Sequence, residues 1–236
     1  MILRLENLTH TYKTAGLEAR TVLDIGMWSL GEGIQLLVRG VSGSGKTTLF
    51  NIIAGLLRPT TGEVYLGEQA LYRLPEAVRD RARAQKIGYI FQTHHLLPAF
   101  TALENVIMPL QFAGTLPASH RAEWAKQLLV QVGLGDYLHH RPSQLSTGQR
   151  LRVAVARGLA NQPSLILADE PTAALDPDNG AVIMDLLQTA CRQTNSTLIV
   201  ASHDPALADR FDQQINLHAG KITAMPPIGE RKLHAL

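Results

Sequence analysis

Three glycines, a lysine and a threonine in residues 40–47 (GVSGSGKT) fit the pattern G-x-x-x-x-G-K-T. The segment follows the apolar run Ile34–Val38 and precedes a helix predicted from Lys46 to about Leu56. Glycines let a backbone turn tightly so that several amide N–H groups converge on one anion, and a helix start adds the positive end of its dipole. Lys46 supplies a charge for phosphate oxygens, and the Thr47 hydroxyl suits Mg²⁺. The pattern predicts a nucleotide-binding loop; a glycine-rich turn that caps an ordinary helix is the alternative.

Two carboxylates end a second apolar run, residues 164–170 (SLILADE). Because a buried charge is costly, an aspartate at the end of a buried strand usually has a partner or a metal. We expect Asp169 to bind Mg²⁺, directly or through water, and Glu170 to orient or deprotonate the attacking water. The alternative is a solvated acidic pair. With a phosphate loop upstream, hydrolysis and not binding alone is the favoured interpretation.

A second segment suited to phosphate is Leu145–Gln149 (LSTGQ), directly before another predicted helix. Ser146 is a good N-cap, and serine and glycine amides at a helix start attract anions. Alone, such a segment would be a simple helix cap. Its position between a phosphate loop and an acidic strand predicts a second phosphate contact.

The ordered set GVSGSGKTT, LSTGQ and LILADEP resembles the nucleotide-binding subunit of ATP-binding cassette (ABC) transporters over nearly the whole chain. LSTGQ is similar to the family signature LSGGQ. The resemblance implies an α/β P-loop NTPase fold with a mainly parallel central sheet, an N-terminal antiparallel β subdomain and an inserted α-helical subdomain. It also implies ATP hydrolysis with ATP and Mg²⁺, in a head-to-tail dimer that sandwiches ATP between one phosphate loop and the other subunit's signature.

The resemblance further assigns roles to single positions. Tyr12 stands where an aromatic ring stacks on adenine, and Asp176 lies in a loop that couples the two sites of the dimer. Gln92 resembles the glutamine that touches Mg²⁺ and water and responds to the membrane partner, and His203 resembles the switch histidine that contacts the γ-phosphate. Thr147 departs from the family glycine; because the flanking Ser146 and Gly148 remain, we expect the signature to work less well but not to be lost. Ala173 stands where the family often has serine and lacks a hydroxyl that could form a hydrogen bond across the dimer.

The complete set of expected site residues divides by role. Expected to contact ATP are Tyr12, Gly40, Val41, Ser42, Gly43, Ser44, Gly45, Lys46, Thr47 and Thr48. Expected in catalysis are Lys46, Gln92, Glu170 and His203, and the expected Mg²⁺ ligands are Thr47, Gln92 and Asp169. The signature residues expected to act in trans are Leu145, Ser146, Thr147, Gly148 and Gln149.

Composition indicates a folded globular chain. The 236 residues are 45% hydrophobic and 18% charged, which excludes intrinsic disorder. A net charge of +2 without a run of five basic residues gives no reason to expect nucleic acid as a partner. The single Cys191 excludes an internal disulfide framework, fits a reducing compartment and is expected to be a buried apolar residue. Neither a signal peptide nor an apolar run of about 20 residues is present, so a cytoplasmic location is expected.

Alternating strand-like and helix-like segments predict one ABC ATPase domain with three parts. The α/β core covers about 1–97 and 146–225, a helical subdomain about 98–145, and a tail 226–236. Expected strands are Ile2–Leu8, Val22–Leu30, Ile34–Val38, Glu63–Leu66, Ile87–Phe91, Leu165–Ala168 and Thr197–Ala201, with Ile215–Leu217 and Lys221–Ala224 as edge strands and a flexible stretch Thr14–Arg20. Expected helices after the first are Gly148–Ala160, Asn179–Gln193 and several in 98–145, separated there by Pro109, Gly114, Pro117 and Gly133.

The sequence after Gln92 bears on the partner. Its apolar residues Leu96, Leu97 and Phe100 either pack the inserted helices or line a groove for a membrane subunit's cytoplasmic helix. The stretch with LLP and TALENV resembles the branch that serves lipoprotein release, macrolide and heme export, and a bacterial cell-division ATPase.

The resemblance thus implies two partners, an ABC transporter membrane subunit and a second ATPase subunit, expected as a homodimer. The chain would then be peripheral on the inner face of the cell membrane. Adjacent histidine pairs without helical H-x₃-H spacing give no transition-metal site. The alternatives are a nucleotide-gated regulatory scaffold with little hydrolysis and a soluble ABC-type ATPase without a transport role.

Overall fold

The computed structural model describes residues 1–13, 16 and 18–224, which form two compact units. Unit 1 comprises Met1–Arg79 together with the chain from Thr197 onward, and unit 2 comprises Asp80–Ser196. The boundary falls inside α2 (Glu76–Lys86). Part of the predicted flexible stretch at 14–20, and the predicted tail at 226–236, lie outside the described residues.

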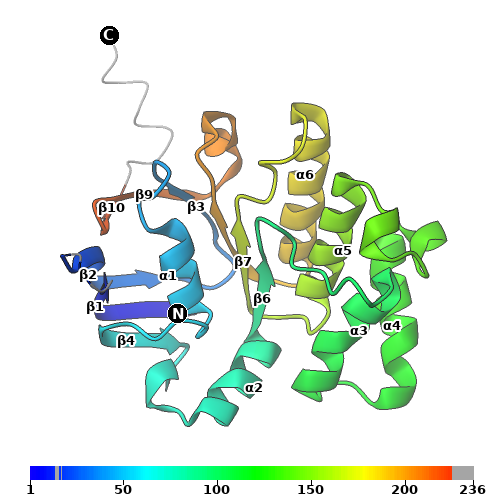
Figure 1. Ribbon diagram of the computed structural model, residues 1–236, viewed down its shortest axis with the longest axis horizontal. Coiled ribbons are helices and arrows are strands. Elements are labelled where there is room, and N and C mark those ends of the chain that lie inside the picture. Colours follow the sequence, from blue (N-terminus) through cyan, green and yellow to red (C-terminus); the bar gives the residue numbers. More distant parts are fainter. Residues whose placement is uncertain (14–15, 17, 225–236) are drawn as a thin grey trace. The chain divides into compact units, whose positions relative to one another are not determined.

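An antiparallel sheet forms the N-terminal part of unit 1, as the sequence predicted. Its strands are β1 (Leu3–Tyr12), β2 (Arg20–Leu30), β4 (Thr61–Leu66) and β5 (Gln69–Ala70), in the order β2-β1-β4-β5 (Figure 1). Leu3 and Leu5 lie two residues apart on one side of β1, and both are fully buried. Leu8 is also fully buried although it lies three residues after Leu5; between them Asn7 has a φ of 47°, and the pairing of β1 with β4 shifts register between Glu6 and Thr9.

A second sheet in unit 1 carries the parallel strands. Its order is β10-β9-β3-β8, from β3 (Gln35–Arg39), β8 (Thr197–Ala201), β9 (Gln213–His218) and β10 (Lys221–Ala224). β3 pairs in parallel with both β8 and β9, and β9 pairs antiparallel with β10. The prediction that Ile215–Leu217 is an edge strand is therefore wrong. The tight turn at Ala219 and Gly220, both at positive φ, lets β10 pair with β9 on the side away from β3, so β10 and not β9 is the edge strand.

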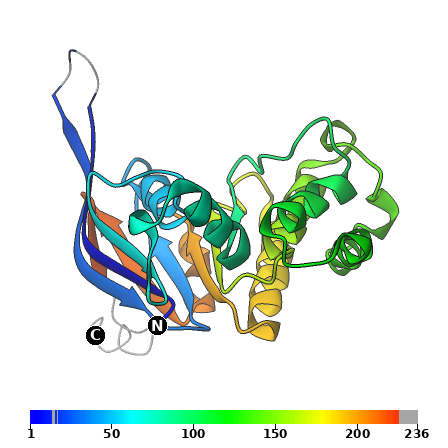
Figure 2. The ribbon, with the colours of Figure 1, turned by 90° about the horizontal axis from the view of Figure 1, so that it is seen from below.

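Unit 2 combines two parallel strands with four α-helices. β6 (Ile87–Ile90) pairs with β7 (Leu165–Asp169). The helices are α3 (Ala102–Ala113), α4 (Ala118–Gln131), α5 (Thr147–Leu159) and α6 (Pro177–Gln193), and α3, α4 and α5 pack together (Figure 2). α5 lies directly against β6, where a Cβ on Gly88 would overlap the backbone carbonyl of Gly158. Only glycine permits an approach this close.

One helix separator was misplaced by the sequence analysis. Pro109 was predicted to separate helices, but it lies inside α3. The helix continues because Val106, Leu110 and Ala113 are buried on both sides of the proline, which offsets the lost backbone hydrogen bond. Gly114, at φ 64, ends α3 as its C-cap.

The sequence analysis assigned no element between the fourth strand and β6. The structure has α2 there, and Ala82 is its one buried residue in the described part of the chain. The helix is mainly charged and its apolar residues are alanine and valine, so it lacks the large apolar side chains from which the other helices were predicted. Helix α1 (Lys46–Ile53) ends before the expected Leu56. The described residues also include four short 3-10 helices, η1 (Leu71–Arg73), η2 (Gly135–Tyr137), η3 (Pro142–Gln144) and η4 (Pro205–Arg210).

Candidate nucleotide site

The predicted phosphate loop of unit 1 runs from the end of β3 into the start of α1. Gly43 and Gly45 have φ values of 76° and 103°, a region in which residues with a side chain are strained. At Gly40, a Cβ would lie 2.5 Å from the Ser44 Oγ and 2.6 Å from the backbone oxygen of Leu217. The glycines of the pattern are thus required by the backbone path itself.

The loop holds a buried cation and a buried hydroxyl. Lys46 is 8% exposed, and its Nζ donates to the carbonyl oxygens of Gly40 at 2.8 Å and Val41 at 3.3 Å. The Ser44 Oγ is buried and has no hydrogen-bond partner among the described residues. Because an unpaired buried hydroxyl costs about 1–3 kcal/mol, such a group favours a ligand that pairs with it. A cation, an unpaired hydroxyl and the first N–H groups of α1 together fit a polyphosphate.

Tyr12 lies at the end of β1, beside the first turn of α1. Its hydroxyl is 3.4 Å from the Thr48 Oγ1, and the residue is 45% exposed. The rings of Tyr12 and His10 make an edge-to-face contact, with their centroids 4.6 Å apart. Burial lowers the pKa of His10, which keeps this neighbour uncharged at neutral pH. The exposed ring of Tyr12 is thus available for stacking, and its role toward adenine stays a prediction.

His203 reaches the same sheet edge as the phosphate loop. β8 and β3 are parallel, with Ala201 opposite Val38, and the Ser202 N–H donates to the Val38 carbonyl at 3.1 Å. His203, exposed, follows β8 by two residues, as Gly40 follows Val38. Unit 1 therefore contains Tyr12, the phosphate loop and His203, and their roles toward ATP stay predictions.

Unit 2 gathers a second group at the carboxyl ends of its two strands. Ile90 of β6 lies opposite Ala168 of β7, so Asp169, the last residue of β7, and Gln92, two residues after β6, lie at neighbouring strand ends. Asp169 is 4% exposed, while Gln92 is exposed. Burial, together with the charge of Asp169, raises the pKa of Tyr89.

Glu170 has an unusual backbone. Its φ is 47°, in the left-handed region, where a residue other than glycine costs about 1–3 kcal/mol. Its carbonyl accepts from the Ala173 N–H at 3.2 Å, which starts the turn towards α6. Strain at a carboxylate next to a buried aspartate is typical of a functional position.

The loop after Gln92 is held by a residue that the sequence analysis missed. His94 and His95 are both in the left-handed region, with φ values of 61° and 45°. Arg157 of α5 donates one guanidinium N–H to the carbonyl of each, both at 2.6 Å. Burial lowers the pKa of Arg157 to about 10, so it stays charged at neutral pH. No sequence signal was available, because arginine on a helix usually faces solvent.

The signature caps α5. The Ser146 Oγ accepts from the Gln149 N–H at 3.2 Å, and the Gln149 Oε1 accepts from the Ser146 N–H at 2.8 Å. Arg150 donates to the carbonyl of Leu145 at 3.1 Å and to the Thr147 Oγ1 at 3.0 Å. The threonine that departs from the family glycine thus has a hydrogen-bond partner on its own helix.

Asp176 is the N-cap of α6. Its carboxylate accepts from the backbone N–H of Asn179 at 3.0 Å and from the side-chain amide of Asn179 at 2.7 Å. These two bonds hold the pKa of Asp176 below its usual value. Nearby, a Cβ at Gly148 would lie 3.8 Å from the side chain of Leu175, so the signature approaches this loop. The capping accounts for Asp176 locally, and its coupling role stays a prediction.

Asn105 organises the apolar segment that precedes α3 and was also missed. It is 1% exposed, and its amide accepts from the Leu97 N–H at 2.8 Å. The same amide donates to the carbonyls of Leu97, Phe100 and Thr101. Leu97 itself is 39% exposed, so part of the predicted apolar cluster faces outward.

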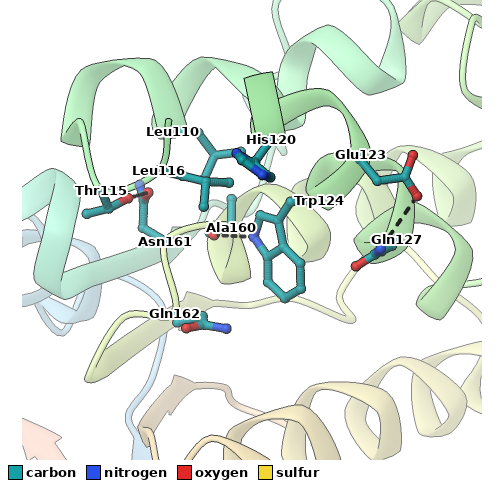
Figure 3. Close-up of a pocket in the computed structure, with 10 residues that line it drawn as sticks. All are labelled: Leu110, Thr115, Leu116, His120, Glu123, Trp124, Gln127, Ala160, Asn161 and Gln162. Carbon is teal, nitrogen blue, oxygen red and sulfur yellow. Dashed lines mark hydrogen bonds between the residues drawn. The ribbon is translucent and has the colours of Figure 1, made fainter. Parts of the chain in front are cut away.

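A cavity of about 350 Å³ lies between the end of α3, α4 and the residues that follow α5, and none of the residues that line it is a predicted site residue (Figure 3). The Trp124 Nε1 donates to the Ala160 carbonyl at 2.8 Å, and the Thr115 hydroxyl donates to the Asn161 Oδ1 at 2.8 Å. These polar groups pair with each other across the lining. The lining residues are Leu110, Thr115, Leu116, His120, Glu123, Trp124, Gln127, Ala160, Asn161 and Gln162.

Comparison with known proteins decides the family. The ABC transporter family matches residues 24–173. The chain is also 40% identical over 225 residues to the lipoprotein-releasing system ATP-binding protein LolD of Shewanella sp. (strain MR-4), covering 95% of this chain and 96% of that protein. The chain belongs to the ABC transporter family. It is an ATP-binding cassette ATPase, the ATP-hydrolysing subunit of a membrane transporter.

Solved structures confirm the expected P-loop NTPase fold. The ATP-binding cassette MJ0796, in a dimeric post-hydrolysis state bound to ADP and Pi, matches with a TM-score of 0.89 and 39% identity. The match covers 96% of this chain and 99% of that one. A second dimeric structure of MJ0796, described as a bacterial ABC transporter cassette, matches with the same values. In the described residues, no helix is long and apolar enough to span a membrane, and no group of three or more histidine, cysteine or acidic side chains could hold a metal ion.

Proposed function

We propose that this ABC ATPase hydrolyses ATP with Mg²⁺ as a head-to-tail homodimer and drives a conformational change in a membrane subunit that releases lipoproteins. The observation that carries the nucleotide chemistry is the phosphate loop, with its buried Lys46 and its unpaired Ser44 hydroxyl. The identity of 40% over 95% of the chain to a lipoprotein-releasing ATPase supports the choice of branch.

The residues divide the chemistry among them. Tyr12 stacks on adenine, and the loop amides of 40–48 bind the phosphate oxygens together with Lys46. Glu170 orients or deprotonates the water that attacks the γ-phosphorus, and His203 contacts the γ-phosphate. Thr47, Gln92 and Asp169 would hold Mg²⁺, which would supply positive charge to the phosphate groups.

The dimer supplies the remaining contacts. The capped start of α5, residues 145–149, acts on the partner subunit's ATP, because serine and glycine amides at a helix start attract phosphate. Thr147 and Asp176 belong to this dimer face. The helical subdomain at about 98–145 receives the membrane subunit, which places the chain on the inner face of the cell membrane.

Affinity capture from native membranes tests this proposal. The tagged chain should recover a membrane protein with a large extracytoplasmic domain, identified by mass spectrometry, and the eluate should hydrolyse ATP. The matched control is Lys46→Ala, which should recover the same partner without ATPase activity. Recovery of soluble partners alone would contradict the transport role, and an active Lys46→Ala complex would contradict the assigned loop chemistry.

A further inference from the structure

We propose that Arg157 is a positioning residue for Gln92, because it fixes the loop after Gln92 to the helix that begins with the signature. This inference rests on the proposed function, in which Gln92 acts at the Mg²⁺ ion and the attacking water. Arg157 itself does not touch the nucleotide in this account. It acts through the backbone of His94 and His95.

The first observation is the geometry of the contact. The two terminal nitrogens of Arg157 donate to two successive carbonyls, His94 and His95, at 2.6 Å each. Hydrogen bonds from a charged donor are shorter and stronger than neutral ones, and the planar fork of arginine fixes both acceptors at once. Arg157 has no carboxylate partner among the described residues. Its charge is therefore compensated by these carbonyls.

The second observation is the conformation that this contact maintains. His94 and His95 both have positive φ, and two successive strained residues persist only where their surroundings hold them. The backbone N–H groups of His94 and His95 donate to the carbonyls of Phe91 and Thr93 at 2.9 and 2.7 Å, and the Phe91 and His95 rings stack at 4.6 Å. These contacts lie within the loop itself. The guanidinium of Arg157 binds the two carbonyls from another element and so ties the loop to α5.

The third observation is where α5 holds this part of the chain. Gly158, next to Arg157, packs backbone to backbone on Gly88 of β6. α5 therefore touches the chain before Gln92, at Gly88, and after it, at His94 and His95. Because a rigid helix links these two contacts to the signature at its other end, a shift of the signature would move the backbone around Gln92.

The same helix offers a matched control. Arg152 of α5 also donates to a loop carbonyl, that of Val132, at 2.8 Å. The loop that it holds follows α4 and contains none of the predicted site residues. Replacement of either arginine by methionine removes one charged donor from α5, so a loss of helix stability alone would affect both variants alike.

The test is a double-mutant cycle on ATPase kcat with Arg157→Met, Gln92→Ala and the double variant, beside Arg152→Met. Loss of a residue that orients a metal ligand typically costs 10–100-fold, so we expect Arg157→Met to lower kcat by about tenfold. The KM for ATP should stay within about twofold, because the phosphate loop is untouched. In the Gln92→Ala background, Arg157→Met should have little further effect, and Arg152→Met should keep the wild-type kcat.

Three results would overturn the inference. If Arg157→Met keeps the wild-type kcat, or if its effect multiplies with that of Gln92→Ala, Arg157 does not act through Gln92. If Gln92→Ala alone keeps the wild-type kcat, this inference falls together with the role of Gln92 in the proposed function. If Arg157→Met does not fold, Arg157→Lys replaces it in the cycle. Lysine keeps the charge but not the two-pronged fork, and the same criteria apply.

Discussion

Ser44 offers a test in which stability and ligand affinity should change in opposite directions. Its hydroxyl is buried in the phosphate loop without a partner among the described residues. In the free protein this hydroxyl lowers the free energy of unfolding, because it lost its hydrogen bonds to water on folding and formed none in the protein. With ATP bound, we expect the same hydroxyl to donate to a phosphate oxygen. Replacement by alanine removes both effects and leaves the Cβ in place.

The magnitudes follow from the burial of this one atom. Relief of an unpaired buried hydroxyl is worth about 1–3 kcal/mol, and we expect Ser44→Ala to gain about 1 kcal/mol in the free energy of unfolding. For a chain of this length, 1 kcal/mol raises the midpoint of thermal unfolding by about 2–4 °C. A hydrogen bond to a charged acceptor is worth about 1.5–3 kcal/mol, so ATP affinity should fall about 10- to 100-fold.

Thermal unfolding without nucleotide and titration calorimetry with ATP measure the two effects. Ser29→Ala is the control, because Ser29 is an exposed serine of β2 in the same unit. It should change the free energy of unfolding by no more than about 0.5 kcal/mol and leave ATP affinity alone. A lower midpoint for Ser44→Ala, or an unchanged affinity for ATP, would refute the reasoning about this hydroxyl.

Two further predictions concern packing and burial. Gly88→Ala places a Cβ into the Gly158 carbonyl and should lower the free energy of unfolding, measured by denaturant titration, by about 1–3 kcal/mol or more. The control Gly26→Ala, whose Cβ would meet nothing within 4 Å, should be nearly neutral. Equal stabilities of the two variants would contradict the close approach of α5 and β6. Burial raises the pKa of Cys191 to about 12, so the folded thiol should resist iodoacetamide at pH 8 and react only after unfolding. In the unfolded chain the same thiol has a pKa of about 8.5, so below that pH it is protonated in both states and does not make stability depend on pH. Between about pH 8.5 and 12 only the unfolded chain loses the proton, so the free energy of unfolding falls as pH rises. Rapid labelling of the folded protein would show that Cys191 is accessible.

Much of the site could be predicted because its chemistry is local in sequence. The glycines at 40, 43 and 45 are each required by the backbone path, so the loop can be recognised from its sequence alone. Asp169 and His203 lie at the ends of strands that the sequence predicted, because each follows a short apolar run and such runs are typical of buried parallel strands. The N-cap role of Ser146 was likewise predicted from its residue type, whereas the reciprocal bond from Gln149 was not.

The rest depended on contacts between distant segments. Arg157 and Asn105 hold loops, and nothing in their neighbours distinguishes them from solvent-facing residues of a helix. Pro109 was misread because burial around it outweighs its helix-breaking tendency, and burial is a tertiary property. The edge position of β9 was wrong for a similar reason, since strand order is set by pairing between distant segments.

The central claim is that this chain hydrolyses ATP in a dimer with Glu170 at the attacking water. Light scattering of Glu170→Gln with ATP and Mg²⁺, followed together with phosphate release, tests it most directly. We expect a persistent ATP-bound dimer that releases almost no phosphate, while the wild-type dimer disappears as ATP is consumed. Phosphate release by Glu170→Gln at the wild-type rate, or a monomer at every ATP concentration, would contradict the account.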